Sequence, residues 1–209
     1  MQGNSPLSTL IHSQSQKYGN RAAMKYKDYS ENKWKDRGWP PYSEKVRLVS
    51  NAMMELGIGI QENIAVFSQN MPECMYVDFG AYAVRAVTIP FYATSSETQV
   101  KYMVSDAKVR YIFVGEQYQY DTAYRVLKIE HCVCGLVIFD RSVKKDEQDT
   151  VSMFFDELLE LGKGFKHQAE VDCRTAELDQ DDLANILYTS GTTGLSKGVM
   201  FTHRMYNTA

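Results

Sequence analysis

Short apolar runs alternate with longer helix-like stretches through the middle of the chain, and this alternation limits the possible folds more than any other feature. The apolar runs cover residues 64–67, 87–89, 111–114 and 136–139. Continuous apolar strands separated by helices are typical of a mainly parallel sheet with helices on both faces, because such strands are buried on both sides. The sequence therefore predicts an α/β fold.

Helix-start signals lie between these strands. Asn70 with Glu73, and Ser96 with Gln99, have the spacing of a capping box, in which each side chain satisfies a backbone N–H of the first turn. The first box predicts a helix to about residue 85, and apolar side chains at helical spacing mark the buried face of the second helix. The other predicted helices span 43–57, with Ser43 as N-cap and Gly57 as the stop, 118–129 and 152–161.

The chain divides into two parts. Residues 1–42 are polar and are predicted to form an irregular segment with short strands, which Pro40 and Pro41 close with an extended turn. Residues 43–209 are predicted to form an α/β nucleotide-binding subdomain. Within it, a polar connector over 162–182 leads into the last apolar strand before a loop.

Composition excludes several classes of function. The chain has 209 residues, 44% of them hydrophobic and 23% charged, which suits one substantial globular domain or two small ones. A net charge of −3 supplies no basic field, so we expect no nucleic-acid partner. The apolar stretch over 75–93 contains Asp78, Arg85 and Pro90, which argues against a membrane span.

The cysteines indicate a reducing compartment. No secretory signal precedes Cys74, Cys132, Cys134 and Cys173, and the single residue between Cys132 and Cys134 does not match common zinc-site spacings. We therefore expect four reduced thiols in a cytoplasmic protein.

The stretch YTSGTTGLSKG, from Tyr188 to Gly198, carries the clearest functional signal. Glycines and small hydroxyl residues leave backbone N–H groups free to surround an anion, and Lys197 adds a mobile positive charge. Apolar strand-like segments precede and follow the stretch, which is unusual for a flexible linker. The pattern favours a loop that holds phosphate oxygens, the alternative being a surface hairpin without a ligand.

The loop is not the nucleotide loop G-x-x-x-x-G-K-[ST]. Counted from Gly191, the second glycine would fall at Ser196, and the hydroxyl residue after Lys197 would fall at Gly198. A helix should also follow that motif, whereas residues 199–202 have the composition of a strand. The sequence predicts a strand–loop–strand clamp, at the carboxyl end of a strand, where ligands bind in parallel sheets.

The extended stretch YTSGTTGLSKGVMFTH resembles the signature of the adenylate-forming (AMP-binding) superfamily. The agreement covers Tyr188, Thr189, Ser190, Gly191, Thr192, Thr193, Gly194, Lys197 and Gly198, and Ser196 stands where the family most often has proline. Residues 55–70, 86–93 and 100–114 also resemble family segments. The segments FSQNMPE and IFVGEQ are most similar to segments of bacterial long-chain fatty acid–CoA ligases.

The resemblance implies a fold, a reaction and a set of site residues. It implies a flavodoxin-like subdomain of a larger N-terminal domain, and an enzyme that activates a fatty acid with ATP and transfers it to coenzyme A. The hydroxyls of Ser190, Thr192 and Thr193, the N–H groups of Gly191 and Gly194, and Lys197 would hold the β- and γ-phosphates. Mg²⁺ would accompany ATP near Thr189 or Thr192, without an assigned metal ligand, and His203 would line the acyl pocket.

Family members are far longer than this chain. The adenine-binding part, the acidic residue near Mg²⁺ and the lid with its catalytic lysine come later in the family, so we expect an N-terminal fragment that is inactive alone. The alternatives are an adenylation domain for an amino or aryl acid, a non-adenylating phosphate-binding module, and a non-catalytic interaction domain. We also expect the partners of the protein to be small-molecule substrates. Further expectations are peripheral contact with a membrane and self-association through an exposed sheet edge.

Overall fold

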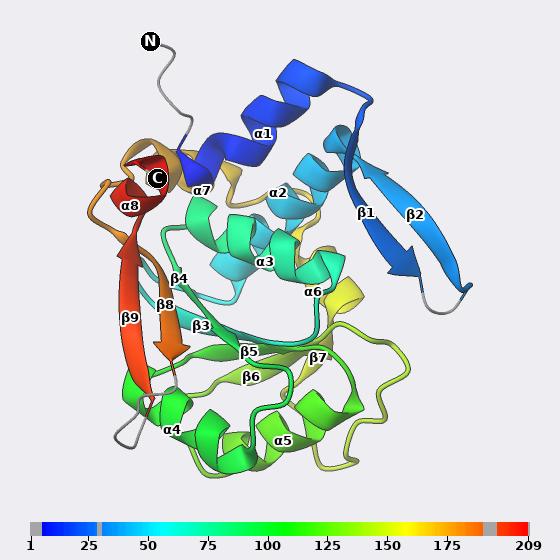
Figure 1. Ribbon diagram of the computed structural model, residues 1–209, viewed down its shortest axis with the longest axis vertical. Helices are drawn as coiled ribbons and strands as arrows, with labels where there is room; N and C mark the ends of the chain where they lie inside the picture. Colours follow the sequence, from blue (N-terminus) through cyan, green and yellow to red (C-terminus); the bar gives the residue numbers. More distant parts are fainter. Residues whose placement is uncertain (1–5, 29–30, 190–195, 209) are drawn as a thin grey trace.

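A seven-stranded sheet forms the centre of the molecule (Figure 1). The computed structural model describes residues 6–28, 31–189 and 196–208. The strands of the sheet are β3 (Asn63–Phe67), β4 (Val87–Phe91), β5 (Tyr111–Val114), β6 (Gly135–Ile138), β7 (Met153–Phe154), β8 (Leu183–Thr189) and β9 (Lys197–Thr202). Strands β3 to β6 match the four predicted apolar runs to within a residue or two.

The strand order confirms the predicted fold class. The sheet runs β7-β6-β5-β3-β4-β8-β9, and every neighbouring pair is parallel except β8 and β9, which form an antiparallel hairpin. Numbered from β3, the first five strands have the order 2-1-3-4-5, which is the flavodoxin-like arrangement. The pair β8–β9 extends the sheet beside β4 and makes β9 an edge strand.

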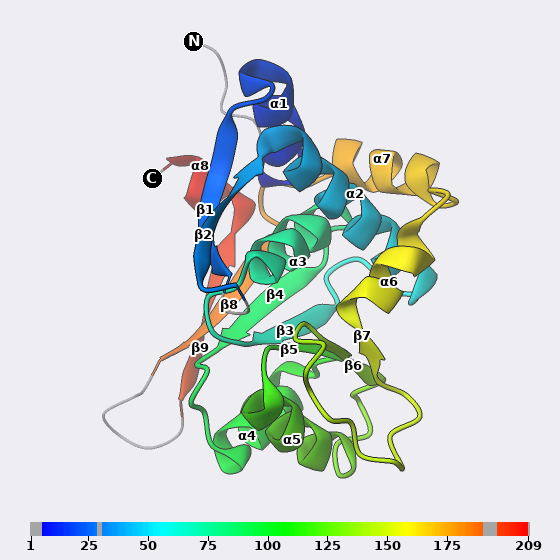
Figure 2. The same cartoon turned by 90° about the vertical axis from the view of Figure 1, so that its right-hand side faces the viewer.

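Helices cover both faces of the sheet (Figure 2). One face packs against α2 (Trp39–Glu55), α3 (Pro72–Ala83) and α6 (Phe155–Gly162), with α1 (Leu7–Tyr18) and α7 (Gln168–Ala176) outside them. The other face packs against α4 (Glu97–Ala107) and α5 (Gln117–Leu127), and α8 (His203–Thr208) follows β9.

Strand β3 shows why its residues are continuously apolar. Ile64 and Val66 belong to the core on the α2–α3 side, whereas Ala65 and Phe67 belong to the core on the α4–α5 side. Because successive side chains of a strand point to opposite faces, a strand that is covered on both faces needs an apolar residue at every position.

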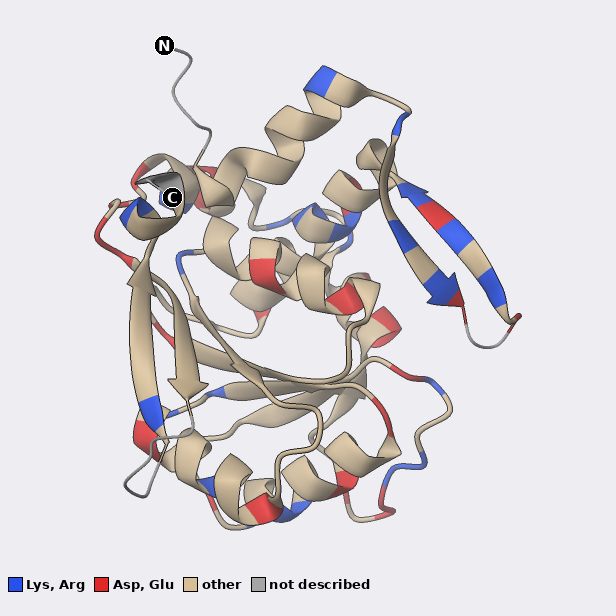
Figure 3. Cartoon of the chain, in the orientation of Figure 1, with Lys and Arg blue, Asp and Glu red and all other residues tan. Residues whose placement is uncertain are grey.

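The N-terminal part differs from the predicted irregular segment. The short strands are confirmed as the hairpin β1 (Ala22–Asp28) and β2 (Lys33–Gly38), but residues 7–18 form helix α1. Ile11 is the buried residue of α1, so the apolar pattern of this helix is too weak to predict it. Contacts with α2 and α3 stabilise the helix. Figure 3 shows that basic residues lie along both strands of the hairpin.

Three helix boundaries also differ from the prediction. Pro40 and Pro41 lie in the first turn of α2 rather than in an extended turn, because proline has the required φ and its missing N–H has no helical partner there. Helix α3 begins after Met71 without a side-chain cap, so the predicted Asn70 box is wrong. Helix α6 begins at Phe155 because the two preceding residues pair with β6.

Two further local predictions have clear outcomes. The Ser96 capping box is confirmed, with the Ser96 hydroxyl accepting from the Gln99 N–H and the Gln99 side chain accepting from the Ser96 N–H. The connector over 162–182, which was predicted only as a polar link to β8, contains the helix α7. That helix buries Val171, and its Thr175 hydroxyl donates to the Ala83 carbonyl at 2.9 Å, so tertiary contacts stabilise it.

The contact between α2 and α6 depends on Gly162. A Cβ atom at this position would lie 2.0 Å from the Leu48 carbonyl oxygen, so the two helices would have to separate. We expect Gly162→Ala to lower the free energy of unfolding by at least about 2 kcal/mol, measured by urea titration. Gly59→Ala is the control, because the added Cβ would meet only the flexible Glu62 side chain at 3.3 Å. Equal stability of the two variants would contradict the prediction.

Candidate functional site

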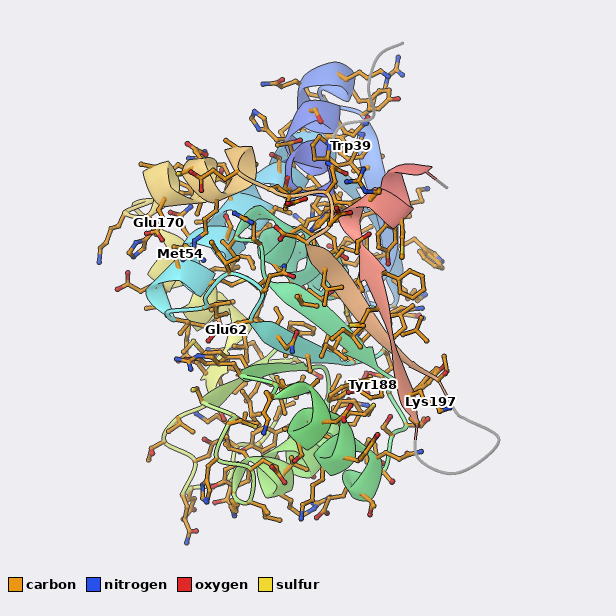
Figure 4. All side chains as sticks on the ribbon, turned by 90° about the vertical axis from the view of Figure 1, so that its left-hand side faces the viewer. Trp39, Met54, Glu62, Glu170, Tyr188 and Lys197 are labelled. Atoms are coloured by element: carbon orange, nitrogen blue, oxygen red, sulfur yellow. The ribbon has the colours of Figure 1, made fainter. Side chains whose placement is uncertain are left out.

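The β8–β9 hairpin frames the predicted phosphate loop. Thr189 and Lys197 are paired opposite each other at its base, and both are exposed. Figure 4 shows Lys197 at this base, where β9 begins. Since β8 is parallel to β4, Thr189 lies at the carboxyl edge of the parallel sheet, where the sequence placed the loop. Ser190, Gly191, Thr192, Thr193 and Gly194 lie outside the described residues, so their predicted roles remain predictions.

Helix α4 holds both ends of the loop. The Tyr102 hydroxyl donates to the carbonyl of Ser196, the residue before Lys197, at 3.0 Å. The Tyr188 hydroxyl donates to the Asp106 carboxylate at 2.5 Å, one residue before Thr189. The two tyrosine rings meet edge to face with their centroids 6.2 Å apart. Burial and the Asp106 carboxylate raise the pKa of Tyr188, so its hydroxyl remains a donor near neutral pH.

The opposite end of the hairpin is fixed by a mostly buried ion pair. Arg85 Nε lies 2.8 Å from the Asp182 carboxylate, and the two side chains are 14% and 12% exposed. The Asp182 carbonyl accepts from the His203 N–H at 3.0 Å, which joins the residue before β8 to the residue after β9. Gln61 bonds both backbone groups of Leu183 through its side-chain amide.

His203 is completely buried at the start of α8. Its ring meets the Tyr82 ring edge to face, with centroids 5.5 Å apart and planes at 83°. Neither ring nitrogen has a hydrogen-bond partner among the described residues. Burial lowers the pKa of His203, the nearby Asp182 carboxylate opposes that shift and Arg85 adds to it, so the imidazole is neutral at pH 7. A neutral ring with unpartnered nitrogens suits contact with a polar group of a ligand.

The structure does not bring Lys197 and His203 together. They lie at opposite ends of β9, which spans about 20 Å at the usual rise per residue. A cavity of about 350 Å³ between α1, α2, α3 and α7, lined by Ile11, Ser43 and Phe79 among others, contains none of the predicted site residues.

A partly buried polar cluster beside His203 was not predicted from the sequence. Its members are Asp78 and Tyr82 of α3, Thr88 of β4, Asn185 of β8 and Tyr206 of α8. The sequence does contain one indication of this cluster, because Thr88 and Asn185 are polar residues inside otherwise apolar strands. Their partners are distant in sequence, so local patterns do not reveal the cluster.

Asp78 makes this cluster sensitive to pH. Burial raises the pKa of the Asp78 carboxyl from 3.8 to about 6, and the nearby Thr88 side chain partly opposes this shift. The folded state therefore binds the proton more tightly than the unfolded state, and stability decreases as pH rises from 3.8 to 6. We expect Asp78→Asn to stabilise the protein by about 2 kcal/mol at pH 8 and by little at pH 4.

Urea titrations at the two pH values measure this difference. Asp121→Asn on the exposed surface of α5 is the control and should show no such pH dependence. An Asp78→Asn variant that is equally stabilised at pH 4 and pH 8 would show that burial of the charge is not the cause.

No group of three or more histidine, cysteine or acidic side chains within the described ranges is arranged to hold a metal ion. Within the same ranges, no helix has the length and apolar character needed to cross a bilayer. His12 contacts Gln16 at 3.0 Å, and His167 contacts Glu55 at 2.7 Å.

The chain belongs to the AMP-binding enzyme family, whose sequence profile matches residues 11–209. This confirms the class that the loop and its strands predicted. The chain is 28% identical to the long-chain-fatty-acid–CoA ligase ACSBG1 of Rattus norvegicus, over 88% of this chain and 25% of that protein. It is 29% identical to the long-chain-fatty-acid–CoA ligase FadD15 of Mycobacterium bovis, over 85% of this chain and 28% of that protein. It thus spans about a quarter of the length of these relatives.

Solved structures of adenylate-forming ligases share the fold. The anthranilate–CoA ligase AuaEII, in complex with anthranoyl-AMP, matches 98% of this chain and 36% of its own length, with a TM-score of 0.73 and 15% identity. A coronafacic acid ligase from Pectobacterium brasiliense matches 95% of this chain and 35% of its own length, with a TM-score of 0.77 and 11% identity. The α/β unit described above therefore corresponds in fold to about a third of each of these two ligases.

Proposed function

We propose that this chain is the N-terminal part of an ATP-dependent acyl-CoA synthetase that activates a long-chain fatty acid. The observation that carries the proposal is the family signature at the carboxyl edge of a parallel sheet, framed by an antiparallel hairpin. Lys197 at its base has no carboxylate partner among the described residues, so its charge is available to an anion.

The proposed roles follow from charge and position. The hydroxyls of Ser190, Thr192 and Thr193, the Gly191 and Gly194 amides, and Lys197 would bind the β- and γ-phosphates of ATP and stabilise departing pyrophosphate. Mg²⁺ would neutralise further phosphate charge near Thr189 or Thr192. The fatty acid carboxylate would attack the α-phosphorus and release pyrophosphate, and the thiol of coenzyme A would then displace AMP from the acyl-adenylate.

The fatty acid is proposed from the long-chain relatives, and His203 is proposed to line its pocket. His203 lies too far along β9 to contact phosphates at Lys197, so its contribution is limited to the acid. The anthranilate–CoA ligase neighbour favours an aryl acid as the second candidate. ATP–pyrophosphate exchange by the full-length protein with palmitate and with benzoate tests the choice. Faster exchange with benzoate would favour the second candidate.

The 209 residues alone are proposed to bind ATP weakly and to complete neither half-reaction, because they match only about a quarter of the length of the relatives. Isothermal titration of this chain with MgATP is expected to show a dissociation constant well above about 1 μM. Submicromolar binding, or thioester formation by these residues, would contradict the expectation.

Three further expectations remain proposals. Self-association is supported by the edge position of β9, where Val199 and Met200 are 43% and 60% exposed. Peripheral membrane contact is supported by exposed Trp34 among the lysines of the β1–β2 hairpin. A cytoplasmic location is supported by the four free cysteines. Light scattering, vesicle sedimentation and cell fractionation, respectively, test them.

A further inference from the structure

Asn185 joins four elements of the fold through one side chain. Its Oδ1 atom accepts hydrogen bonds from the Tyr82 hydroxyl of α3 at 2.9 Å and from the Tyr206 hydroxyl of α8 at 2.8 Å. Its Nδ2 group donates to the Thr88 hydroxyl of β4 at 2.5 Å. Asn185 is 6% exposed and Thr88 is fully buried, so the contacts with Tyr82 and Thr88 are shielded from water, whereas Tyr206 is 42% exposed and its contact is only partly buried.

An asparagine inside an apolar strand needs these partners. A buried amide without hydrogen bonds is strongly unfavourable, and replacing it would leave two tyrosine hydroxyls without their shared acceptor. The Thr88 hydroxyl also lies near enough to the Asp78 carboxyl to lower its pKa, so Thr88 links Asn185 to a second residue of α3. The position of the Tyr82 ring is therefore determined by several connected hydrogen bonds rather than by packing alone.

The Tyr82 ring is the surface against which His203 packs. The His203 backbone is fixed separately, by its N–H bond to the Asp182 carbonyl. With the backbone fixed, the edge-to-face contact with Tyr82 limits the remaining freedom of the imidazole. Two charged groups act on His203, Asp182 before β8 and Arg85 after α3, and Asp78 of α3 acts on the neighbouring Tyr82.

We propose that Asn185 is a positioning residue of the acid-binding site, which holds Tyr82 and Tyr206 so that the buried His203 ring keeps one orientation. The proposal rests on the proposed role of His203 in binding the fatty acid. Asn185 acts through Tyr82 and does not touch the substrate. Its loss therefore weakens acid binding more than ATP binding, because the phosphate loop is anchored separately by Tyr102 and Tyr188.

The decisive variants are Asn185→Leu, which removes the amide, and Asn185→Asp, which keeps acceptor oxygens for both tyrosines. Tyr82→Phe and Tyr206→Phe each remove one hydroxyl from the shared oxygen. Tyr120→Phe is the matched control for Tyr82→Phe, because Tyr120 and Tyr82 are both buried but the Tyr120 hydroxyl donates to Asp149, away from His203. Circular dichroism identifies the variants that fold.

Two measurements are made on the full-length protein. Nuclear magnetic resonance of ¹⁵N-labelled histidines, with His203→Gln to assign the His203 signal, reports the ring environment and its pKa. Steady-state pyrophosphate exchange separates KM for the acid from KM for ATP and from kcat. Asn185→Leu is expected to raise the His203 pKa and to raise KM for the acid about tenfold, with a smaller change in KM for ATP.

In Asn185→Asp, KM for the acid is expected to return most of the way to the wild-type value. Tyr120→Phe is expected to leave the His203 pKa and KM for the acid unchanged. A folded Asn185→Leu variant with an unchanged His203 signal would overturn the proposal. If Asn185→Leu does not fold, an unchanged His203 signal in Tyr82→Phe would overturn it equally. If His203→Gln leaves KM for the acid unchanged, His203 does not contribute to acid binding. The His203 signal in Asn185→Leu would still show whether Asn185 positions the imidazole.

Discussion

Replacing Lys197 by alanine is expected to lower kcat/KM for ATP in the adenylation half-reaction of the full-length protein by about a hundredfold. Lys197 begins β9 directly across from Thr189, at the base of the loop, and it is exposed. Its charge would stabilise the pyrophosphate that departs in the transition state, and a neutral side chain cannot replace that interaction. Pyrophosphate exchange at saturating fatty acid measures the effect.

The control is Lys144→Ala, which removes an exposed lysine from the loop after β6 and should leave the exchange rate unchanged. Lys197→Arg should retain more activity than Lys197→Ala, because the charge is kept while its geometry changes. Both alanine variants should unfold at the same urea concentration. Wild-type exchange by Lys197→Ala would remove the phosphate-binding role of the loop.

Replacing Asp182 by alanine is expected to lower the free energy of unfolding by about 3 kcal/mol, the largest stability effect that we predict. The mutation leaves the Arg85 guanidinium in a mostly buried position without its carboxylate partner. It also removes the acceptor for the Asp179 N–H at 3.3 Å, so the turn before β8 loses a second contact. Thermal unfolding should shift down by roughly 6–12 °C for a chain of this size.

The adjacent Asp181 provides the control. It pairs with Arg204 at 2.7 Å, but the two side chains are 69% and 57% exposed, so Asp181→Ala should cost less than about 1 kcal/mol. Arg85→Met combined with Asp182→Ala should recover part of the loss, because it removes the uncompensated charge. Equal destabilisation by Asp181→Ala and Asp182→Ala would show that burial of the ion pair is unimportant.

The predictable elements are those with strong local signals. Strands β3 to β6 are continuously apolar because helices cover both faces of the sheet, and the Ser96 box satisfies its backbone groups within one turn. Helices α1 and α7 bury Ile11 and Val171 respectively and were missed. Their stability comes from contacts with α2 and α3, which a local pattern does not contain.

The candidate site divides in the same way. The loop from Thr189 to Lys197 was predicted because its glycines, hydroxyls and lysine are contiguous, and phosphate binding needs those groups close together. The cluster around Asn185 was not predicted, since its bond to Tyr82 joins residues that are 103 positions apart. The separation of His203 from Lys197 along β9 also required the structure.

The amino-acid sequence by itself therefore determined the α/β class and the position, after a strand, of the loop that we propose binds phosphate, because each depends on neighbouring residues. Only the tertiary structure decided which side chains support that loop and how His203 is held. Tyr102, Asp106, Asp182 and Asn185 act through partners that other elements supply. Those partners become neighbours only when the sheet and its two helical layers have assembled, since hydrogen bonds and ion pairs act over a few ångströms.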